Sequence, residues 1–509
     1  MKLIYQRYSS LPQLAWCARF RSGEPFVEVE HGSAVETRGD YFFEGAWSGG
    51  FSAAEYLAAP VVVGTGGALS GNGVHFIPGS DRISPLFSIA GRSGIHISNS
   101  PIFAMASAGE HLDGMYPFYF QDFLRTWRMG LHSPAGRLRL ASGKHLKVHF
   151  FTHLIVDERG RISYRAHSAG AKPENFHSYD SILMNGVKAV FANARDENRT
   201  RTLVPWAAIS KGYDSTATAC LAARAGCKEA YTFIDRRLDD RDIDSGRANA
   251  AILGMECREY DRWAYQKMPD VQDSECAMIP VAALTPMAAL EDKLQGKLMI
   301  TANYGDIIWG LVESGCCEKL TLPWSRFLSG VGQLEFRLRT GYHVMDGSCI
   351  GARHNQEIHR ITYSAEMKPW WVEGSYNRPI PRRIAEEAGL SRGQFGVFKY
   401  ASCHSSYGHV GGFRAESHQD YLDFVRSRDV ACGAFSRIYW MARDKIQRAL
   451  WKWFSSDRRI YQQVAWWRRY LPYLLNTTPK DIRWIYRFTF QWSEKRLGAR
   501  YAGKPRDKT

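Results

Sequence analysis

The sequence predicts an α/β protein, in which a β-rich N-terminal part precedes a doubly wound parallel sheet and a basic helical extension follows it. Residues 1 to about 195 alternate short apolar runs with Gly, Ser and Pro turns, which is typical of strands joined by tight loops. From residue 196 to about 400, strand-like runs alternate with helix-like runs, which favours a parallel sheet wrapped by helices. Residues 437–493 have helical periodicity, with tryptophans interleaved among arginines. We therefore expect three domains, 1–195, 196–405 and 406–509.

Strand candidates occur in the first two domains. In the first domain they are PVVVG (60–64), GVHFI (73–77), SGIHIS (93–98), HLKVHFFTHLIV (145–156) and GRISYRAHS (160–168). In the second domain they are YTFID (231–235), ECREY (256–260) and KLMITA (297–302). Helix-like segments separate the second set, so its strands can pair in parallel.

Composition disfavours several classes of protein. No apolar run reaches the roughly 18 residues that a membrane-spanning helix needs, and polar residues interrupt the N-terminus too early for a signal peptide. The ten cysteines form no CxxC pair, which disfavours a zinc site or a disulfide framework. We therefore expect a cytoplasmic protein with reduced thiols.

Positive charge is concentrated at the C-terminus. Residues 437–509 contain 18 Lys and Arg against five Asp and Glu, which is +13 of the total net charge of +15. Such an extension could contact an anionic membrane surface, bind RNA, or form a packed helical subdomain. The helical spacing of its tryptophans favours the packed subdomain.

The segment LVPWAAISKGYDSTATACLAARAG (203–226) has the layout of a pyrophosphate-binding loop. An apolar strand leads into Ser210, Lys211, Gly212, Asp214 and Ser215, and an alanine-rich helix follows at once. Glycine allows a tight turn, while hydroxyls and amides at the helix start face phosphate oxygens and the helix dipole favours the anion. The loop predicts ATP binding. The alternative is an ordinary turn in which Asp214 or Ser215 is an N-cap.

A second loop follows the strand at 297–302, where the chain reads Asn303, Tyr304, Gly305 and Asp306. In open α/β sheets, ligands bind beyond the carboxyl ends of the strands. We therefore expect this loop to share one crevice with the phosphate loop, with Asp306 as a magnesium ligand.

These motifs together resemble the synthetase domain of the asparagine synthetase family, which includes β-lactam synthetases and lasso-peptide cyclases. SKGYDS (210–215) is similar to that family's SGGxDS loop, with Lys211 in place of a glycine. The run at 232–260 is similar to its second strand, helix and third strand, and KLMITANYGDIIWG (297–310) to its second phosphate and magnesium loop. Ile307 occupies a position that is acidic in asparagine synthetases and is closer to the β-lactam synthetase version.

The resemblance implies an ATP pyrophosphatase domain that adenylates a carboxylate with ATP and Mg²⁺, for attack by ammonia or an amine. Ser210, Lys211, Gly212, Ser215 and Gly305 would contact the nucleotide, and Asp214 and Asp306 would hold the metal. Leu334-Glu335-Phe336-Arg337 looks like the family's LE-x-R segment, and Lys399 lies at about the spacing of its catalytic lysine. The implied catalytic set is Tyr304 paired with Glu335 as the proton acceptor, and Lys399 as a fixed positive charge.

The N-terminal domain looks like the glutaminase domain of the same family, because HISNSPIFAMASAG (96–109) is similar to its SNS segment. A glutaminase of this type needs an exposed N-terminal cysteine as nucleophile. This chain begins Met1-Lys2, and its first cysteine is Cys17. We therefore expect a degenerate domain without glutaminase activity.

Other interpretations remain open. Asp306 could be a loop cap, Tyr304 a packed aromatic, Glu335 a salt-bridge partner and Lys399 a solvated lysine. At the level of function, the alternatives are a tRNA-modifying enzyme with the same phosphate loop and a non-catalytic scaffold at a membrane surface. The absence of paired cysteines disfavours sulfur transfer to tRNA, so we do not expect a nucleic-acid partner.

Overall fold

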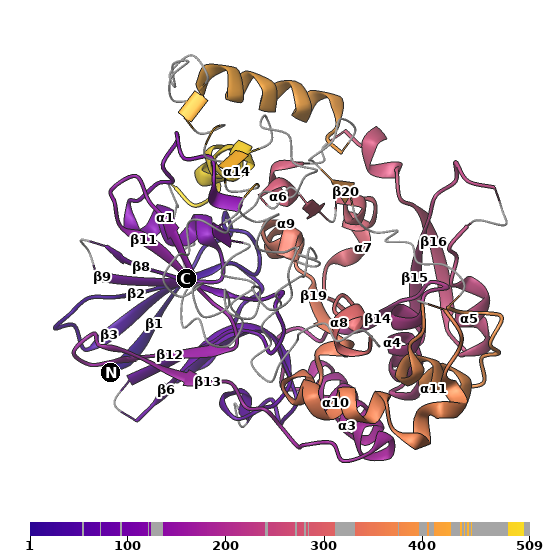
Figure 1. The fold of residues 1–509 in the computed structure, drawn as a ribbon. Helices are drawn as coiled ribbons and strands as arrows, with labels where there is room; N and C mark the ends of the chain where they lie inside the picture. The colour runs from indigo at the N-terminus through magenta and orange to yellow at the C-terminus, as the bar shows by residue number, and fades with distance from the viewer. Residues whose placement is uncertain are drawn as a thin grey trace.

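The computed structural model contains a β-rich N-terminal region and a separate parallel sheet (Figure 1). It describes residues 1–502 except for 53–54, 72, 92–93, 121, 124–135, 240–242, 270–271, 279–280, 284, 311–330, 375, 397–404, 407–411, 429–437, 440–441, 443–444, 447–448 and 450–486. The α/β class predicted from the sequence is confirmed, as are its β-rich first part and its parallel sheet.

Two sheets build the N-terminal region. The first has the strand order β1-β3-β2-β9-β8-β11-β10 and contains β1 (Lys2–Arg7), β2 (Trp16–Phe20), β3 (Phe26–His31), β8 (Leu86–Gly91), β9 (Gly94–Ser98), β10 (Gly136–Arg139) and β11 (His145–His149). The second has the order β13-β12-β7-β6-β5-β4 and contains β4 (Glu36–Thr37), β5 (Tyr41–Trp47), β6 (Val62–Ser70), β7 (Gly73–Ile77), β12 (Thr152–Asp157) and β13 (Ile162–Ala166). Each predicted strand segment of this region therefore contains a strand.

The two sheets share an apolar core. Trp16 and Phe20 come from the first sheet, and Phe42 and Phe76 from the second, and all four belong to one buried cluster. The rings of Trp16 and Phe42 meet edge to face, with centroids 4.8 Å apart. Helix α1 (Pro101–Ala108) packs on β8 and β9, and helix α3 (Phe176–Ala194) packs on β5. Burial of these apolar side chains between the two layers stabilises the N-terminal region.

The run at 145–156 forms two strands in place of one. β11 ends at His149 and belongs to the first sheet, whereas β12 starts at Thr152 and belongs to the second. Between them, Phe151 has a φ of 53°. A positive φ turns the chain sharply, which allows it to pass from one sheet to the other.

The parallel sheet has the strand order β16-β15-β14-β18-β19. Its strands are β14 (Val204–Ala208), β15 (Glu229–Ile234), β16 (Glu256–Asp261), β18 (Lys297–Thr301) and β19 (His343–Asp346), and every neighbouring pair is parallel. The chain adds strands on one side of β14 and then returns to add β18 and β19 on the other side. Strand order therefore reverses between β14 and β18, which is where ligands bind in sheets of this kind.

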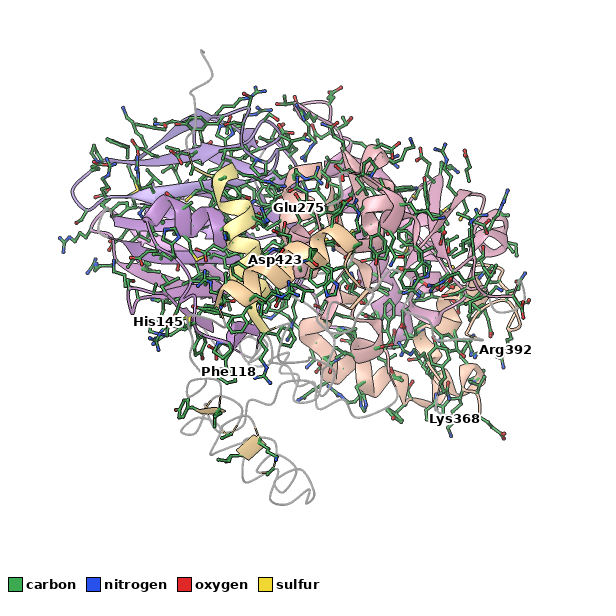
Figure 2. All side chains as sticks on the ribbon, turned by 90° about the horizontal axis from the view of Figure 1, so that it is seen from above. Phe118, His145, Glu275, Lys368, Arg392 and Asp423 are labelled. Atoms are coloured by element: carbon green, nitrogen blue, oxygen red, sulfur yellow. The ribbon has the colours of Figure 1, made fainter. Side chains whose placement is uncertain are left out.

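The described part of the C-terminal extension packs across both regions. It contains a helix over 415–428 and α14 (Thr489–Leu497), and Figures 1 and 2 show α14 beside the N-terminal sheets. The Gln491 side chain donates to the Tyr116 carbonyl at 2.6 Å, and the Trp492 indole donates to Asp420 at 2.8 Å. The other tryptophans of the predicted helical run lie outside the described residues. In the part of the chain that the structure describes, no helix has the length and apolarity needed to cross a membrane.

Candidate functional site

The two predicted loops meet at one edge of the parallel sheet. The phosphate loop follows β14, and the loop from Asn303 to Asp306 follows β18. β14 and β18 are paired in parallel, with Trp206 opposite Met299, so their carboxyl ends lie at the same edge. The two loops that the sequence predicts to lie together therefore do meet, at the point where strand order reverses.

Close packing joins the loops. A Cβ atom added to Gly305 would lie 2.4 Å from Cγ of Asp214, which is far shorter than any ordinary contact. Arg378 closes the same junction, because its guanidinium donates to Oδ2 of Asp214 and to Oδ1 of Asp306. The two carboxylates predicted to bind magnesium thus share one arginine.

Hydrogen bonds within the phosphate loop fix its shape. The hydroxyls of Ser210 and Ser215 are 2.7 Å apart, and the Gly212 amide donates to Ser210 Oγ at 3.0 Å. The Lys211 amide donates to Asp244 at 2.7 Å, and its ammonium donates to the Ile243 carbonyl at 2.8 Å. The Lys211 side chain therefore has a backbone partner, and the loop is a preformed turn.

Helix α4 (Tyr213–Arg224) begins directly at this loop. Its N-cap is Gly212, and no side chain caps it, so neither Asp214 nor Ser215 is the N-cap. The Tyr213 amide points to the hydroxyl of Tyr376 at 3.5 Å. Asp214 and Ser215 therefore lie inside the first turn of α4, and the prediction that one of them is its N-cap is wrong. At the positive end of the helix dipole, Asp214 instead accepts from Arg378, and Ser215 hydrogen-bonds to Ser210.

Burial controls the electrostatics of the carboxylate pair. The pKa of Asp214 is raised to about 6: burial is the largest cause, the charge of Arg378 acts against it, and the negative charge of Asp306 acts with it. The same two carboxylates raise the pKa of Arg378, against the effect of its burial. Two acidic groups can lie this close because the guanidinium offsets their repulsion.

The donor set fits Mg²⁺. Oδ1 of Asp214 is buried and has no hydrogen-bond partner among the described residues, so one carboxylate oxygen has capacity for a further ligand. Mg²⁺ prefers oxygen ligands, and in nucleotide sites it is bound by one or two carboxylates together with phosphates and waters. In the described ranges, no three His, Cys, Asp or Glu side chains form a metal-binding group. Asp214 and Asp306 would therefore hold the ion only together with substrate oxygens.

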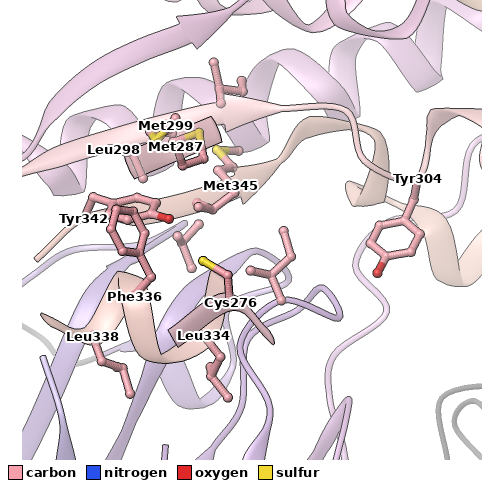
Figure 3. Close-up of a cluster of buried hydrophobic side chains, with 14 of the residues drawn as sticks. Cys276, Met287, Leu298, Met299, Tyr304, Leu334, Phe336, Leu338, Tyr342 and Met345 are labelled. Atoms are coloured by element: carbon pink, nitrogen blue, oxygen red, sulfur yellow. The ribbon is translucent and has the colours of Figure 1, made fainter. Parts of the chain in front are cut away.

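The predicted pairing of Glu335 with Tyr304 is wrong. Both carboxylate oxygens of Glu335 accept hydrogen bonds at 2.6 Å, one from the Ser100 hydroxyl and one from the Tyr501 hydroxyl. Tyr304 is buried at the start of α8 (Gly305–Ile308), and its amide donates to Asp346 at 3.1 Å. Figure 3 shows Tyr304 well apart from Leu334, the neighbour of Glu335.

The reason lies in helix α9 (Leu334–Thr340), on which Glu335 and Arg337 both contact the N-terminal region. Arg337 forms a two-bond ion pair with Glu44 of β5, at 2.8 and 3.0 Å. On the same helix, Glu335 reaches Ser100, which caps helix α1. The LE-x-R segment therefore joins the two regions of the molecule, and Glu335 has a structural role here.

Tyr501→Phe is expected to lower the free energy of unfolding by about 1–3 kcal/mol, because it removes a donor from the buried Glu335 carboxylate. The phenyl ring can keep its stacking on Phe103, where the ring centroids are 4.9 Å apart. Urea denaturation followed by tryptophan fluorescence measures the loss. Tyr164→Phe is the matched control, because Tyr164 is 41% exposed. Equal stability of Tyr501→Phe and the wild type would contradict a structural role for this bond.

The remaining predicted residue, Lys399, lies outside the described residues. Sequence reasoning missed Arg378 and Tyr376, which both contact the phosphate loop or its carboxylates. Arg378 is the N-cap residue of α11 (Pro379–Glu387), and the proline after it is the only local signal that a helix begins there. The proline predicts the start of a helix, but it gives no information about Asp214, which lies 164 positions away from Arg378.

Comparison of the chain with protein-family models found no match, and comparison with curated proteins found none. What the crevice can bind is therefore inferred from its own groups: two carboxylates on neighbouring loops, a hydroxyl-lined turn and the start of a helix.

Proposed function

We propose that this chain is an ATP-dependent synthetase that adenylates a carboxylate, with release of pyrophosphate, and passes the acyl group to an amine or to ammonia. The observation that carries this proposal is the meeting of Asp214 and Asp306 beside the phosphate loop, at the point where strand order reverses. Chain segments about 90 residues apart supply the two carboxylates, and one or two carboxylates are what Mg²⁺ commonly uses beside phosphates. In this proposal the parallel sheet is a doubly wound ATP pyrophosphatase domain of the asparagine synthetase type.

Activation is needed because a carboxylate does not react with an amine at neutral pH, since its oxygen is a poor leaving group. Attack of the carboxylate oxygen on the α-phosphorus of ATP forms an acyl-adenylate and releases pyrophosphate, and AMP then becomes the leaving group. The hydroxyls of Ser210 and Ser215 and the amide of Gly212 lie at the start of α4. These groups now hydrogen-bond to one another within the loop. Phosphate oxygens would take the place of those bonds and accept from the same hydroxyls and amide.

The carboxylates of Asp214 and Asp306 would hold Mg²⁺, which when bound neutralises charge on the departing pyrophosphate. Gly305 lets their loops approach, because any side chain there would collide with Asp214. Lys211 would steady the loop through its bond to the Ile243 carbonyl. Each of these residues therefore positions the phosphates or the metal, and none of them transfers a proton.

Amide formation follows when an amine attacks the adenylate. Lys399 is the proposed source of positive charge for that transition state. Glu335 is not part of this chemistry, because the N-terminal and C-terminal segments take both of its carboxylate oxygens. Tyr304 stays close to the crevice through its place before Gly305, and burial raises its pKa well above the ordinary value of a tyrosine. A tyrosine in that state is a poor proton acceptor at neutral pH.

The N-terminal region is proposed as a degenerate glutaminase-like domain. Cys17, the first cysteine of the sequence, is buried within β2 and is therefore not exposed as a nucleophile. The amine or ammonia would therefore come from solution or from a second substrate. Purified protein should release no ammonia from glutamine, and a coupled ammonia assay measures this directly.

ATP–pyrophosphate exchange tests the proposal. The protein is incubated with Mg²⁺, ATP and labelled pyrophosphate, across a panel of amino acids, uronic acids and peptide acids. We expect exchange that depends on one class of carboxylate and disappears in Asp306→Ala. Arg383→Gln serves as the control, because Arg383 on helix α11 pairs with Glu366 and Glu387. Absence of exchange together with absence of ATP binding in calorimetry would refute the synthetase proposal and favour the scaffold. Exchange that requires RNA would favour a tRNA-modifying enzyme.

A further inference from the structure

Arg378 occupies the position between the two proposed metal ligands. Its Nη1 donates to Oδ2 of Asp214 and its Nη2 donates to Oδ1 of Asp306, so one guanidinium bridges both loops. The side chain is 7% exposed, which means that it lies inside the junction of the loops. A planar guanidinium can satisfy two carboxylates at once in a way that a lysine ammonium cannot.

The residues around Arg378 also cover the phosphate loop. The hydroxyl of Tyr376 is 3.5 Å from the Tyr213 amide at the start of α4, and the rings of the two tyrosines have centroids 4.8 Å apart. The Arg378 guanidinium lies 5.4 Å from the centre of the Tyr376 ring. The short segment from Tyr376 to Arg378 therefore contacts both places where a nucleotide with its metal would bind: the helix start and the carboxylate pair.

The charges explain why a cation belongs there. Asp214 and Asp306 together carry two negative charges, and the guanidinium that joins them carries one positive charge. A divalent cation would compensate both, and it would need the same carboxylate oxygens that the guanidinium now holds. The guanidinium and a metal ion therefore compete for these oxygens. A polyphosphate entering the crevice would offer the displaced guanidinium a bidentate partner of the kind that it prefers.

We infer that Arg378 is a positioning residue of the proposed synthetase: it holds Asp214 and Asp306 together before the nucleotide arrives, yields them to Mg²⁺ as ATP binds, and then pairs with the polyphosphate. This inference rests on the proposed function. It predicts opposite effects of one substitution, namely stronger binding of a metal ion alone and weaker binding of ATP. A residue needed only for folding would weaken both.

The test uses the full chain and Mn²⁺ as a probe for Mg²⁺, with free Mn²⁺ measured by electron paramagnetic resonance. Arg378→Gln should bind Mn²⁺ without nucleotide at least about tenfold more tightly than the wild type, because the competing cation is gone. In calorimetry, the same variant should bind a non-hydrolysable ATP analogue about tenfold more weakly. Arg383→Gln is the control, since Arg383 lies on the same helix but pairs with Glu387 and stacks on Phe176.

Two results would overturn the inference. If the wild type binds the ATP analogue and Mn²⁺, and Arg378→Gln binds both with unchanged affinity, then Arg378 does not compete with the metal. If the wild type binds neither probe, the proposed function fails, and the inference fails with it. Should Arg378→Gln not fold, Arg378→Lys replaces it, because a lysine can hold one carboxylate but cannot bridge both. Arg378→Lys should then bind Mn²⁺ alone more tightly and the ATP analogue more weakly than the wild type, each by a smaller factor than Arg378→Gln. Unchanged affinities would again overturn the inference.

Discussion

Replacing Arg337 with methionine is expected to lower the free energy of unfolding by about 3–5 kcal/mol, which is the cost of leaving a buried charge without its partner. Arg337 and Glu44 are joined by two hydrogen bonds of 2.8 and 3.0 Å, and their side chains are 1% and 0% exposed. The Glu44 carboxylate also accepts from Thr65 at 2.9 Å and lies 3.3 Å from His343. Loss of the guanidinium would leave this carboxylate buried without its charged partner, in the interface between the N-terminal region and the parallel sheet.

Urea denaturation of Arg337→Met, Glu44→Gln and the double variant measures the effect. The double variant should be more stable than the sum of the single losses predicts, because it leaves neither charge unpaired. Arg224→Met is the matched control: Arg224 makes two bonds to Asp180 but is 39% exposed, so its loss should cost about 1 kcal/mol or less. A loss below about 1 kcal/mol for Arg337→Met would contradict a buried ion pair as the tie between the regions.

The same pair gives the fold a dependence on pH. Although burial opposes ionisation, the charge of Arg337 lowers the pKa of Glu44 from 4.5 to about 2. Because the folded-state pKa is the lower one, the unfolded chain binds the proton first, and the contribution of Glu44 to stability is complete above pH 4.5. It is lost as the pH falls from 4.5 towards 2. The stability difference between wild type and Glu44→Gln should therefore shrink over that range.

The regular elements could be predicted from the sequence because their signals are local. The strands at 231–235 and 297–302 stand out as short apolar runs between turns, the strand at 256–260 follows the helix-like segment before it, and the structure confirms each one. The division of 145–156 into two strands could not be predicted. It depends on a positive φ at Phe151, a bulky residue for which the sequence gives no expectation of a turn.

The candidate site shows the same division between local and distant information. Asp214 and Asp306 could be predicted to lie close together, because each follows a strand and the carboxyl ends of parallel strands lie at the same edge of the sheet. The partner of Glu335 could not be predicted. Ser100 lies 235 positions away, and the sequence of helix α9 does not say which region of the molecule the carboxylate faces. Arg378 was missed for a similar reason: no local pattern gives its partner, and only the tertiary fold brings it to the carboxylates.

Gly305→Ala is expected to reduce ATP–pyrophosphate exchange by about 100-fold or more while leaving the protein folded. A Cβ atom at this position would lie 2.4 Å from Cγ and 2.5 Å from Cβ of Asp214, so the start of α8 must move away from the phosphate loop. That movement carries Asp306 with it, and a displacement of about 1 Å in a catalytic arrangement costs about 100-fold in rate. Gly393→Ala is the matched control, since a Cβ atom there meets no atom within 4 Å. Unchanged exchange in Gly305→Ala would mean that the close approach of the two loops is not needed for nucleotide chemistry, and that Asp214 and Asp306 do not act on one metal ion.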